Sequence, residues 1–241
     1  MGRNVSVKDS REKKLRVLLA VLCTLGIIYF VPQSIAVWII LSVFWWIVFR
    51  PWQVYEVILF AIAAVFFLIQ NYICLKAGIF EFRVKDVLLM PFYEPFLWGF
   101  YFMTLTRLIS EEGHRQLDLE YRKFCEVPQM NSVIGLLVTS VAFSVFSRTP
   151  WFFPATLAST LVLFMMFHTR RDFYYAGCSL LLGFIVEIFG VSAGFWSYPE
   201  SDFAGIPYWF APMWISVGLL GYRFLLPLSR WVAARFEFQG A

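Results

Sequence analysis

The sequence predicts an all-α, polytopic transmembrane bundle of about eight helices, arranged as two parallel four-helix repeats. The first observation is composition: 60% of the 241 residues are hydrophobic and only 15% are charged, with a mean hydropathy of +0.70. Soluble domains carry about 25% charged residues, so a soluble domain is excluded. The second observation is an internal repeat at a spacing of 116 positions, which fixes the architecture to look for.

The repeat joins two stretches, Asn71–Arg107 and Glu187–Arg223, which match without gaps when one is shifted by 116 positions. The identical pairs are Ala77/Ala193, Gly78/Gly194, Asp86/Asp202, Pro91/Pro207, Trp98/Trp214 and Arg107/Arg223. The alternative is that two aromatic-rich membrane segments match by composition alone. We favour duplication because the matches fall on glycine, proline, aspartate, tryptophan and arginine, which substitute for one another poorly.

Apolar runs long enough for ~30 Å of hydrocarbon, at roughly 20 residues each, predict the helices. The predicted helices lie near 15–32, 34–50, 53–77, 88–109, 131–148, 150–168, 172–194 and 207–229. Two tight turns, around Pro32 and Pro150, separate neighbouring helices, since proline ends one helix and helps begin the next. The turns lie close to 116 positions apart, which extends the repeat over the chain.

These boundaries divide the chain into five parts, listed in order: a cytoplasmic N-terminal tail 1–14, a first four-helix repeat 15–109, a cytoplasmic linker 110–130, a second four-helix repeat 131–229 and a cytoplasmic C-terminal tail 230–241. The linker is the only sizeable hydrophilic segment. It is either an amphipathic helix on the membrane surface or a solvated connector, and its mixed charge favours the connector.

Charge predicts the orientation. Of the 20 Lys and Arg residues, all but Lys76, Arg83, Lys85 and Arg148 fall on one side of the predicted membrane, which leaves 20 − 4 = 16 on the other. The positive-inside rule makes the richer side cytoplasmic, so we expect both termini inside, in a bacterial inner membrane. An even number of helices per repeat makes the two halves parallel, related by an axis along the membrane normal.

Ionisable residues within the helices are the sharpest functional signal, since a charge at mid-bilayer costs ~3 kcal/mol or more. Glu187 lies ~22 Å along its predicted helix, in the outer half of the membrane. Glu94 lies near the outer start of another helix, and Asn71 holds in the first repeat the position of Glu187. Because burial favours the neutral carboxyl, Glu187 and Glu94 are candidate catalytic proton donors. The alternative for Glu187 is a structural hydrogen bond between helices.

Two more acids, Glu56 and Asp172, lie at inner helix ends. We expect them to be interfacial anchors or partners of Arg50 and Arg171. Arg107 and Arg223 close helices at the same face, where lipid phosphates or helix C-termini would hold them.

The outer loops repeat an aromatic-x-aromatic pattern, Phe80/Phe82 and Trp196/Tyr198, followed by Asp86 and Asp202. One reading is an ordinary aromatic belt at the membrane interface. The functional reading is a lid over a cavity whose aromatic faces hold an apolar chain or a carbocation. The candidate substrate-binding residues are Asn71, Trp196, Tyr198, Asp202 and Trp214.

Several chemistries are excluded. The chain has 2 histidines, too few for a multi-histidine di-iron site, and its 4 cysteines lack zinc-binding spacing. It has no phosphate-binding loop, dinucleotide fingerprint or nucleophile elbow. We therefore expect no metal, no cofactor and no nucleic acid, and a partner that is a membrane lipid or an apolar small molecule. Membrane protein partners remain open.

The paired stretches resemble the duplicated integral-membrane lycopene cyclase and carotenoid hydratase families. The similarity covers Phe80-Glu81-Phe82 through Pro91-Phe92-Tyr93-Glu94, and Trp196-Ser197-Tyr198 through Pro207-Tyr208-Trp209. This chain has a single Glu94 where the cyclases carry an acidic pair, and four rather than three helices per repeat. The resemblance implies an all-helical fold and carotenoid biosynthesis.

Two classes of function follow. The first is an enzyme that protonates an apolar isoprenoid, polyene or lipid chain and so starts a cyclisation, hydration or isomerisation. The second is a non-catalytic membrane protein, either a carrier or an accessory subunit of a lipid or envelope system. A carrier needs a polar path to both faces. The carboxyls here concentrate at outer depth, which disfavours a carrier and leaves an accessory subunit open.

Overall fold

A computed structural model describes residues 7–109 and 129–239 of the chain. Nearly all of the predicted linker, residues 110–128, lies outside the described residues. The elements are α1 (Val7–Phe30), α2 (Ser34–Val48), α3 (Val54–Lys76), β1 (Glu81–Phe82), α4 (Glu94–Ile109), α6 (Met130–Phe146), α7 (Phe152–Met166), α8 (Arg170–Ser192), β2 (Trp196–Ser197), α9 (Phe210–Leu220), the π-helical turn η2 (Gly221–Leu225) and α10 (Leu226–Gln239).

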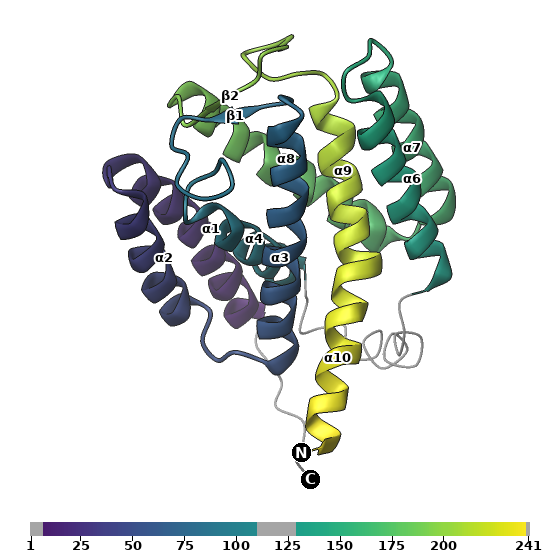
Figure 1. Cartoon of the computed structure of the whole chain (residues 1–241). Coiled ribbons are helices and arrows are strands. Elements are labelled where there is room, and N and C mark those ends of the chain that lie inside the picture. The colour runs from purple at the N-terminus through teal and green to yellow at the C-terminus, as the bar shows by residue number, and fades with distance from the viewer. Residues whose placement is uncertain (1–6, 110–128, 240–241) are drawn as a thin grey trace.

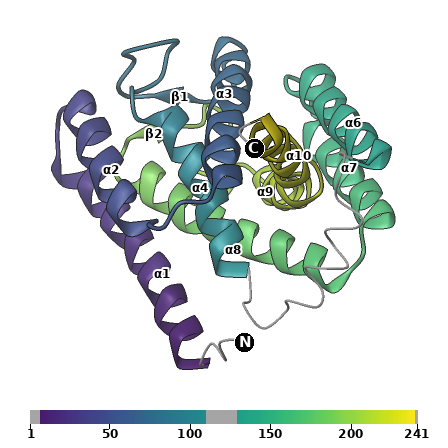
Figure 2. The same ribbon diagram turned by 90° about the horizontal axis from the view of Figure 1, so that it is seen from below.

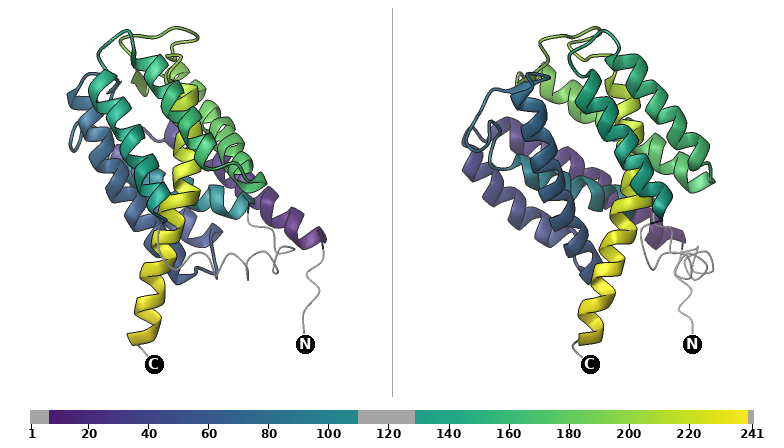
Figure 3. Two further views of the ribbon diagram at one scale, coloured as in Figure 1. Left: turned by 90° about the vertical axis from the view of Figure 1, so that its right-hand side faces the viewer. Right: turned by 45° about the vertical axis from the view of Figure 1, so that its right-hand side comes forward.

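The helices form one bundle in which α9, η2 and α10 make a single long rod (Figure 1). The rod packs on α8 through its first part and on α3 through α10. The hairpin α1–α2 flanks it on one side and the hairpin α6–α7 on the other (Figure 2). The start of α1 and the end of α10 lie at the same end of the bundle (Figure 3). The short ribbon β1–β2 lies at the opposite end (Figure 1).

Within residues 7–109 and 129–239, three helical segments are long and apolar enough to cross a membrane, namely Val54–Lys76, Arg170–Ser192 and Phe210–Phe236. Three shorter apolar helices accompany them: Ser34–Val48, Met130–Phe146 and Phe152–Met166. Their outer faces are apolar, as expected where lipid replaces water: Ile39, Leu137 and Leu161 are each about half exposed. The prediction of an all-α membrane bundle of about eight helices is confirmed at this level.

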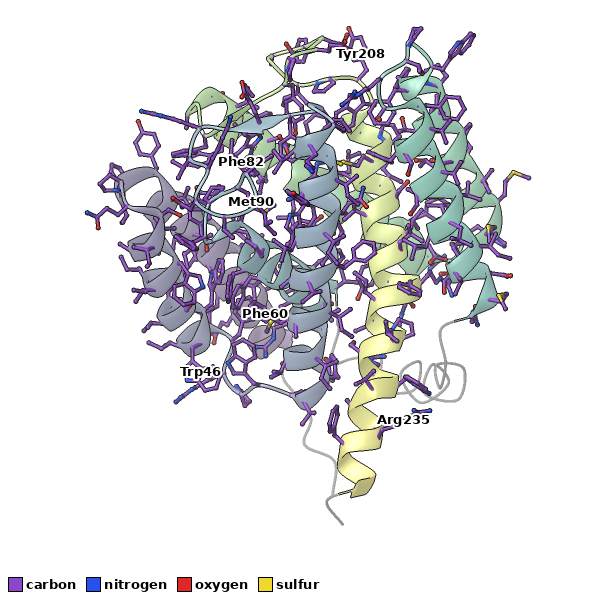
Figure 4. All side chains as sticks on the ribbon, in the orientation of Figure 1. Trp46, Phe60, Phe82, Met90, Tyr208 and Arg235 are labelled. Carbon is purple, nitrogen blue, oxygen red and sulfur yellow. The ribbon has the colours of Figure 1, made fainter. Side chains whose placement is uncertain are left out.

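Side chains fill the bundle interior (Figure 4). The largest buried cluster brings together Leu59 of α3, Leu105 of α4, Tyr175 of α8 and Leu225 of η2, so the two halves of the chain share one core. Gly221 allows this contact, because a Cβ there would collide with the ring of Phe102. Side chains from both halves therefore form one continuous core, and the halves are not two separately packed domains.

The fourth predicted helix starts later than expected. Residues 88–93 are apolar enough to belong to it, but α4 begins at Glu94. The preceding residues form a tight turn that pairs Val87 with Met90, and Leu88 and Leu89 adopt positive φ of 48° and 66°. Such a two-residue turn requires left-handed backbone. Apolar composition alone cannot reveal it, because leucine avoids that conformation.

The acids at the beginnings of α3 and α8 have partners other than those expected. Glu56 accepts hydrogen bonds from Nε and Nη2 of Arg107, each at 2.7 Å. Asp172 accepts hydrogen bonds from Nε and Nη2 of Arg223, each at 2.6 Å. The expected partners were Arg50 and Arg171, and the structure corrects them to Arg107 and Arg223. Arg107 also donates to the carbonyl of Phe49, the C-cap of α2, at 2.7 Å, so the expectation that a helix C-terminus holds this arginine is confirmed. The physical reason for the corrected partners is geometry. Arg107 lies in the last turn of α4, which packs on α3, and Arg223 lies in η2, which continues the helix α9 that packs on α8. A planar guanidinium thus meets a carboxylate inside the bundle in each case.

Several local structures recur 116 positions apart. Each acid just described closes a capping box, Gln53 with Glu56 in α3 and Thr169 with Asp172 in α8. The left-handed glycines Gly78 and Gly194 end the same two helices, with φ of 69° and 70°. A second tight turn, Phe203 to Ile206, matches the first.

Candidate functional site

A cavity of about 230 Å³ lies inside the bundle. It is bounded by α1, α2, α3, α4, α6, α8, α9 and η2, together with the β1–β2 ribbon. Its lining is dominated by apolar and aromatic side chains such as Leu25, Phe66, Leu136 and Leu220, and no lysine, arginine or histidine of the described residues lines it. Such a lining suits an apolar ligand, with polar groups to fix its orientation.

Glu94, in the first turn of α4, is one of two carboxyls on the cavity wall. Its side chain is buried, and its Oε1 atom accepts hydrogen bonds from Asn71 Nδ2 and Trp98 Nε1, both at 3.1 Å. Trp98 lies one turn along the same helix, where an i, i+4 pair meets. The helices α3 and α4 thus hold Glu94 in place through neutral donors.

Glu187, on α8, is the second carboxyl. It is also buried, and its Oε2 atom accepts hydrogen bonds from Trp196 Nε1 at 2.7 Å and Tyr198 Oη at 2.8 Å. Gly190 admits the Trp196 ring, because any Cβ there would collide with it. Burial, followed by the neighbouring Glu187, raises the pKa of Tyr198 well above its usual value, so its hydroxyl remains a donor.

The β1–β2 ribbon places the aromatic residues of the two outer loops over one end of the cavity. Glu81 pairs with Ser197 and Phe82 with Trp196, and the Phe82 and Trp196 rings lie 5.9 Å apart in a T-shaped arrangement. Figure 4 labels Phe82 at this end of the molecule. Because rings from both loops line the cavity, the ribbon acts as its cover.

The indoles of Trp98 and Trp214 stack on each other below this cover, with centroids 5.3 Å apart and planes at 14°. Gly183 makes room for Trp214, since a Cβ there would collide with its ring. Trp98 donates to Glu94, whereas Trp214 Nε1 is buried without a hydrogen-bond partner among the described residues. The position that matches Glu94 in the second half is Phe210, which offers no acceptor.

The structure brings six of the seven predicted site residues to the cavity: Asn71, Glu94, Glu187, Trp196, Tyr198 and Trp214. Asp202 is not among its lining residues. It is exposed, and its carboxylate accepts the backbone N–H of Tyr208 at 2.8 Å. Asp86 makes the same bond with Phe92 in the first loop. Aspartate at this position therefore stabilises a turn.

Sequence reasoning missed Trp98 as a partner of Glu94. The i, i+4 spacing of the two residues on one helix was the available signal. It also missed the hydroxyl groups of the cavity wall, to which Thr24 of α1 and Thr139 of α6 contribute. No sequence signal marks these residues, because threonine is common in membrane helices and both hydroxyls bond to their own helix backbone.

No model of a known protein family matches the chain, and no curated protein sequence matches it. Two solved structures share its fold. One is a cross-linked trimer of a cysteine-substituted MvINS, with a TM-score of 0.57, 20% identity, and coverage of 77% of this chain and 98% of that chain. The other is MvINS, a mycobacterial Insig homologue from Mycobacterium vanbaalenii, with a TM-score of 0.54, 21% identity and the same coverage.

These similarities overturn the resemblance to lycopene cyclases and carotenoid hydratases. The shared motif was an aromatic-x-aromatic loop leading to a proline and an acid. In the structure, these residues form a ribbon, a tight turn and a helix start, which local aromatic and proline spacing can produce in unrelated folds. The prediction of a role in carotenoid biosynthesis rested on that resemblance and is therefore not supported. The chain is an integral membrane protein with an Insig-like helical fold.

Proposed function

We propose that this protein is an intramembrane binding protein for one apolar lipid, held in the cavity between its two halves. The observation that carries the proposal is the cavity itself, which is walled mainly by apolar and aromatic side chains from both halves of the chain and contains the two carboxyls Glu94 and Glu187. Burial of an apolar chain there contributes about 25 cal/mol per Å². This is the non-catalytic class of function.

The test fills the cavity. Val186 of α8 lines it, and Val186→Trp should obstruct it, whereas Leu181→Trp on the same helix replaces a side chain that is 63% exposed. Native mass spectrometry of protein purified in mild detergent measures the bound lipid. We expect wild type and Leu181→Trp to retain one lipid, and Val186→Trp to retain at least tenfold less. Equal occupancy in all three proteins would contradict the proposal.

A second candidate function is proton-initiated chemistry on the bound chain, such as cyclisation, hydration or isomerisation. It is favoured by the position of Glu187, whose Oε2 atom is held by Trp196 and Tyr198 while the residue lines an apolar cavity. Lipid extracts from cells expressing wild type, Glu187→Gln or Glu94→Gln at matched levels distinguish the two functions. A product that disappears with Glu187→Gln supports chemistry, and unchanged profiles support binding alone.

We also infer that the chain consists of two parallel four-helix repeats related by an axis along the membrane normal. Equivalent residues that contact each other must lie beside such an axis. Two such pairs occur, Glu81 with Ser197 in the ribbon and Trp98 with Trp214 in the stack, and each is 116 positions apart. A bacterial inner membrane with both termini cytoplasmic remains part of this proposal, and reporter fusions at each terminus test the orientation.

A further inference from the structure

Four acidic side chains are buried in the described part of the chain, and they fall into two pairs. Glu56 and Asp172 each meet a guanidinium at hydrogen-bonding distance. Glu94 and Glu187 have only neutral donors, namely an amide, two indoles and a phenol. An isolated carboxylate is costly in an apolar medium. A guanidinium offsets this cost for Glu56 and Asp172, whereas only neutral donors do so for Glu94 and Glu187.

Each carboxyl of the second pair uses only one oxygen for protein contacts. Both donors to Glu94 bind Oε1, and both donors to Glu187 bind Oε2. Across residues 7–109 and 129–239, no group bonds to Glu94 Oε2 or Glu187 Oε1, although the side chains are only 8% and 7% exposed. Since both residues line the cavity, two unpartnered oxygens are available to a ligand.

Aromatic side chains hold both carboxyls by their other oxygens. Trp98 and Trp196 donate to the carboxyls through their indole nitrogens, and Tyr198 packs against Phe80 with ring centroids 5.9 Å apart. The indoles meet the carboxyls through their N–H edges, and the Trp98 ring is stacked on Phe67 and Trp214, with centroids 3.9 and 5.3 Å away. The carboxyl oxygens, and not ring faces, are therefore the groups offered to a ligand. An ammonium group carries three N–H donors and a positive charge, which match acceptor oxygens of two carboxylates.

We infer that the cavity selects a long-chain amine, whose ammonium group lies between Glu94 and Glu187 while its hydrocarbon chain follows the apolar wall toward Leu136 and Leu220. The inference rests on the proposed lipid-binding function and names the ligand class for it. The ligand supplies the positive charge that arginine supplies to Glu56 and Asp172. The two carboxyls act in binding, with no covalent step.

The experiment compares two probes of equal chain length, hexadecylamine and hexadecanol, on the full chain purified in dodecyl maltoside. Retention of each radiolabelled probe is measured at pH 7 for wild type, Glu94→Gln/Glu187→Gln and Glu81→Gln. Glutamine preserves an acceptor for the indole and phenol donors, so the double variant should fold. Glu81 lies in the ribbon but is exposed and paired with Lys85, so its variant controls for loss of surface charge.

We expect wild type and Glu81→Gln to bind the amine at least tenfold more tightly than the alcohol. The double variant should lose this preference and retain the alcohol, which also reports that it is folded. Equal binding of both probes by wild type, with both lost in Val186→Trp, would overturn the amine inference and leave the lipid-binding function standing. No binding of either probe, with Val186→Trp like wild type, would overturn both.

Discussion

The two halves of the chain agree where their helices α3 and α8 begin and differ around the cavity. At the helix starts, Glu56 with Arg107 and Asp172 with Arg223 form the same bidentate ion pair. At the cavity, the first half places its acid at the start of α4 and an amide on α3, whereas the second half places its acid on α8. The two halves thus share their ion pairs and differ in where the cavity carboxyl lies, although the cavity residues Trp98 and Trp214 are identical.

The largest effect should come from breaking the shared ion pair. Asp172 is fully buried, so Arg223→Leu leaves an uncompensated charge and should cost about 3–5 kcal/mol of unfolding free energy. Arg107→Leu should cost a similar amount through Glu56. Unfolding in mixed detergent micelles measures both.

The control is the double variant Arg223→Leu/Asp172→Asn, which removes the charge but keeps a side chain that can accept from Thr169. It should recover most of the lost stability. If the single and double variants are equally destabilised, the loss comes from packing of the arginine side chain and the ion pair contributes little.

A smaller difference in unfolding free energy is expected between variants of the two stacked tryptophans. Trp98→Phe and Trp214→Phe remove the same volume from the stack, but only Trp98 loses a hydrogen bond, the one to Glu94. Trp214→Phe removes a buried N–H that has no partner in the described structure. We expect Trp98→Phe to be less stable than Trp214→Phe by about 1–2 kcal/mol, measured by the same unfolding assay.

Bound ligand adds a second measurement to this pair. The inferred ammonium group offers no acceptor to Trp214 Nε1, so Trp214→Phe should leave amine retention unchanged. Trp98→Phe removes a donor that holds Glu94 in place and should weaken amine retention. Equal stability of the two variants in ligand-free protein would contradict the assignment of the hydrogen bond to the first half alone.

The helices and the cavity carboxyls could be predicted from the sequence because both depend on hydropathy. Long apolar runs mark the spans, and Glu187 interrupts such a run, so its importance is visible without a structure. The partners of the acids could not be predicted. Arg107 lies 51 positions from Glu56, and only the packing of α4 on α3 brings them together. Nearer candidates such as Arg50 were the natural choice, since sequence distance is the only distance that a sequence provides.

Asp202 and Leu88 show the same limit on a local scale. A loop aspartate between aromatic residues suits a binding site as well as a turn, and the hydrogen bond to the Tyr208 N–H decides between them. An apolar pair such as Leu88-Leu89 suits a helix, and only the fold reveals that it occupies a left-handed turn. Residues that serve backbone geometry are therefore the ones that pattern analysis assigns wrongly.

The smallest effect should come from that turn, and it compares the halves directly. Leu89 has φ of 66° in the first half, and the matching position in the second half is Gly205, with φ of 79°. A left-handed conformation costs roughly 1–2 kcal/mol for a residue with a Cβ and almost nothing for glycine.

Leu89 is 41% exposed, so Leu89→Gly forfeits part of its burial and should still stabilise the protein by about 0.5–1 kcal/mol. Gly205→Ala should destabilise it by more, because its Cβ would also lie 2.7 Å from Val191 Cγ1. Thermal unfolding of both variants gives the sign, and destabilisation by Leu89→Gly would show that the leucine side chain packs against lipid or protein more strongly than its backbone is strained.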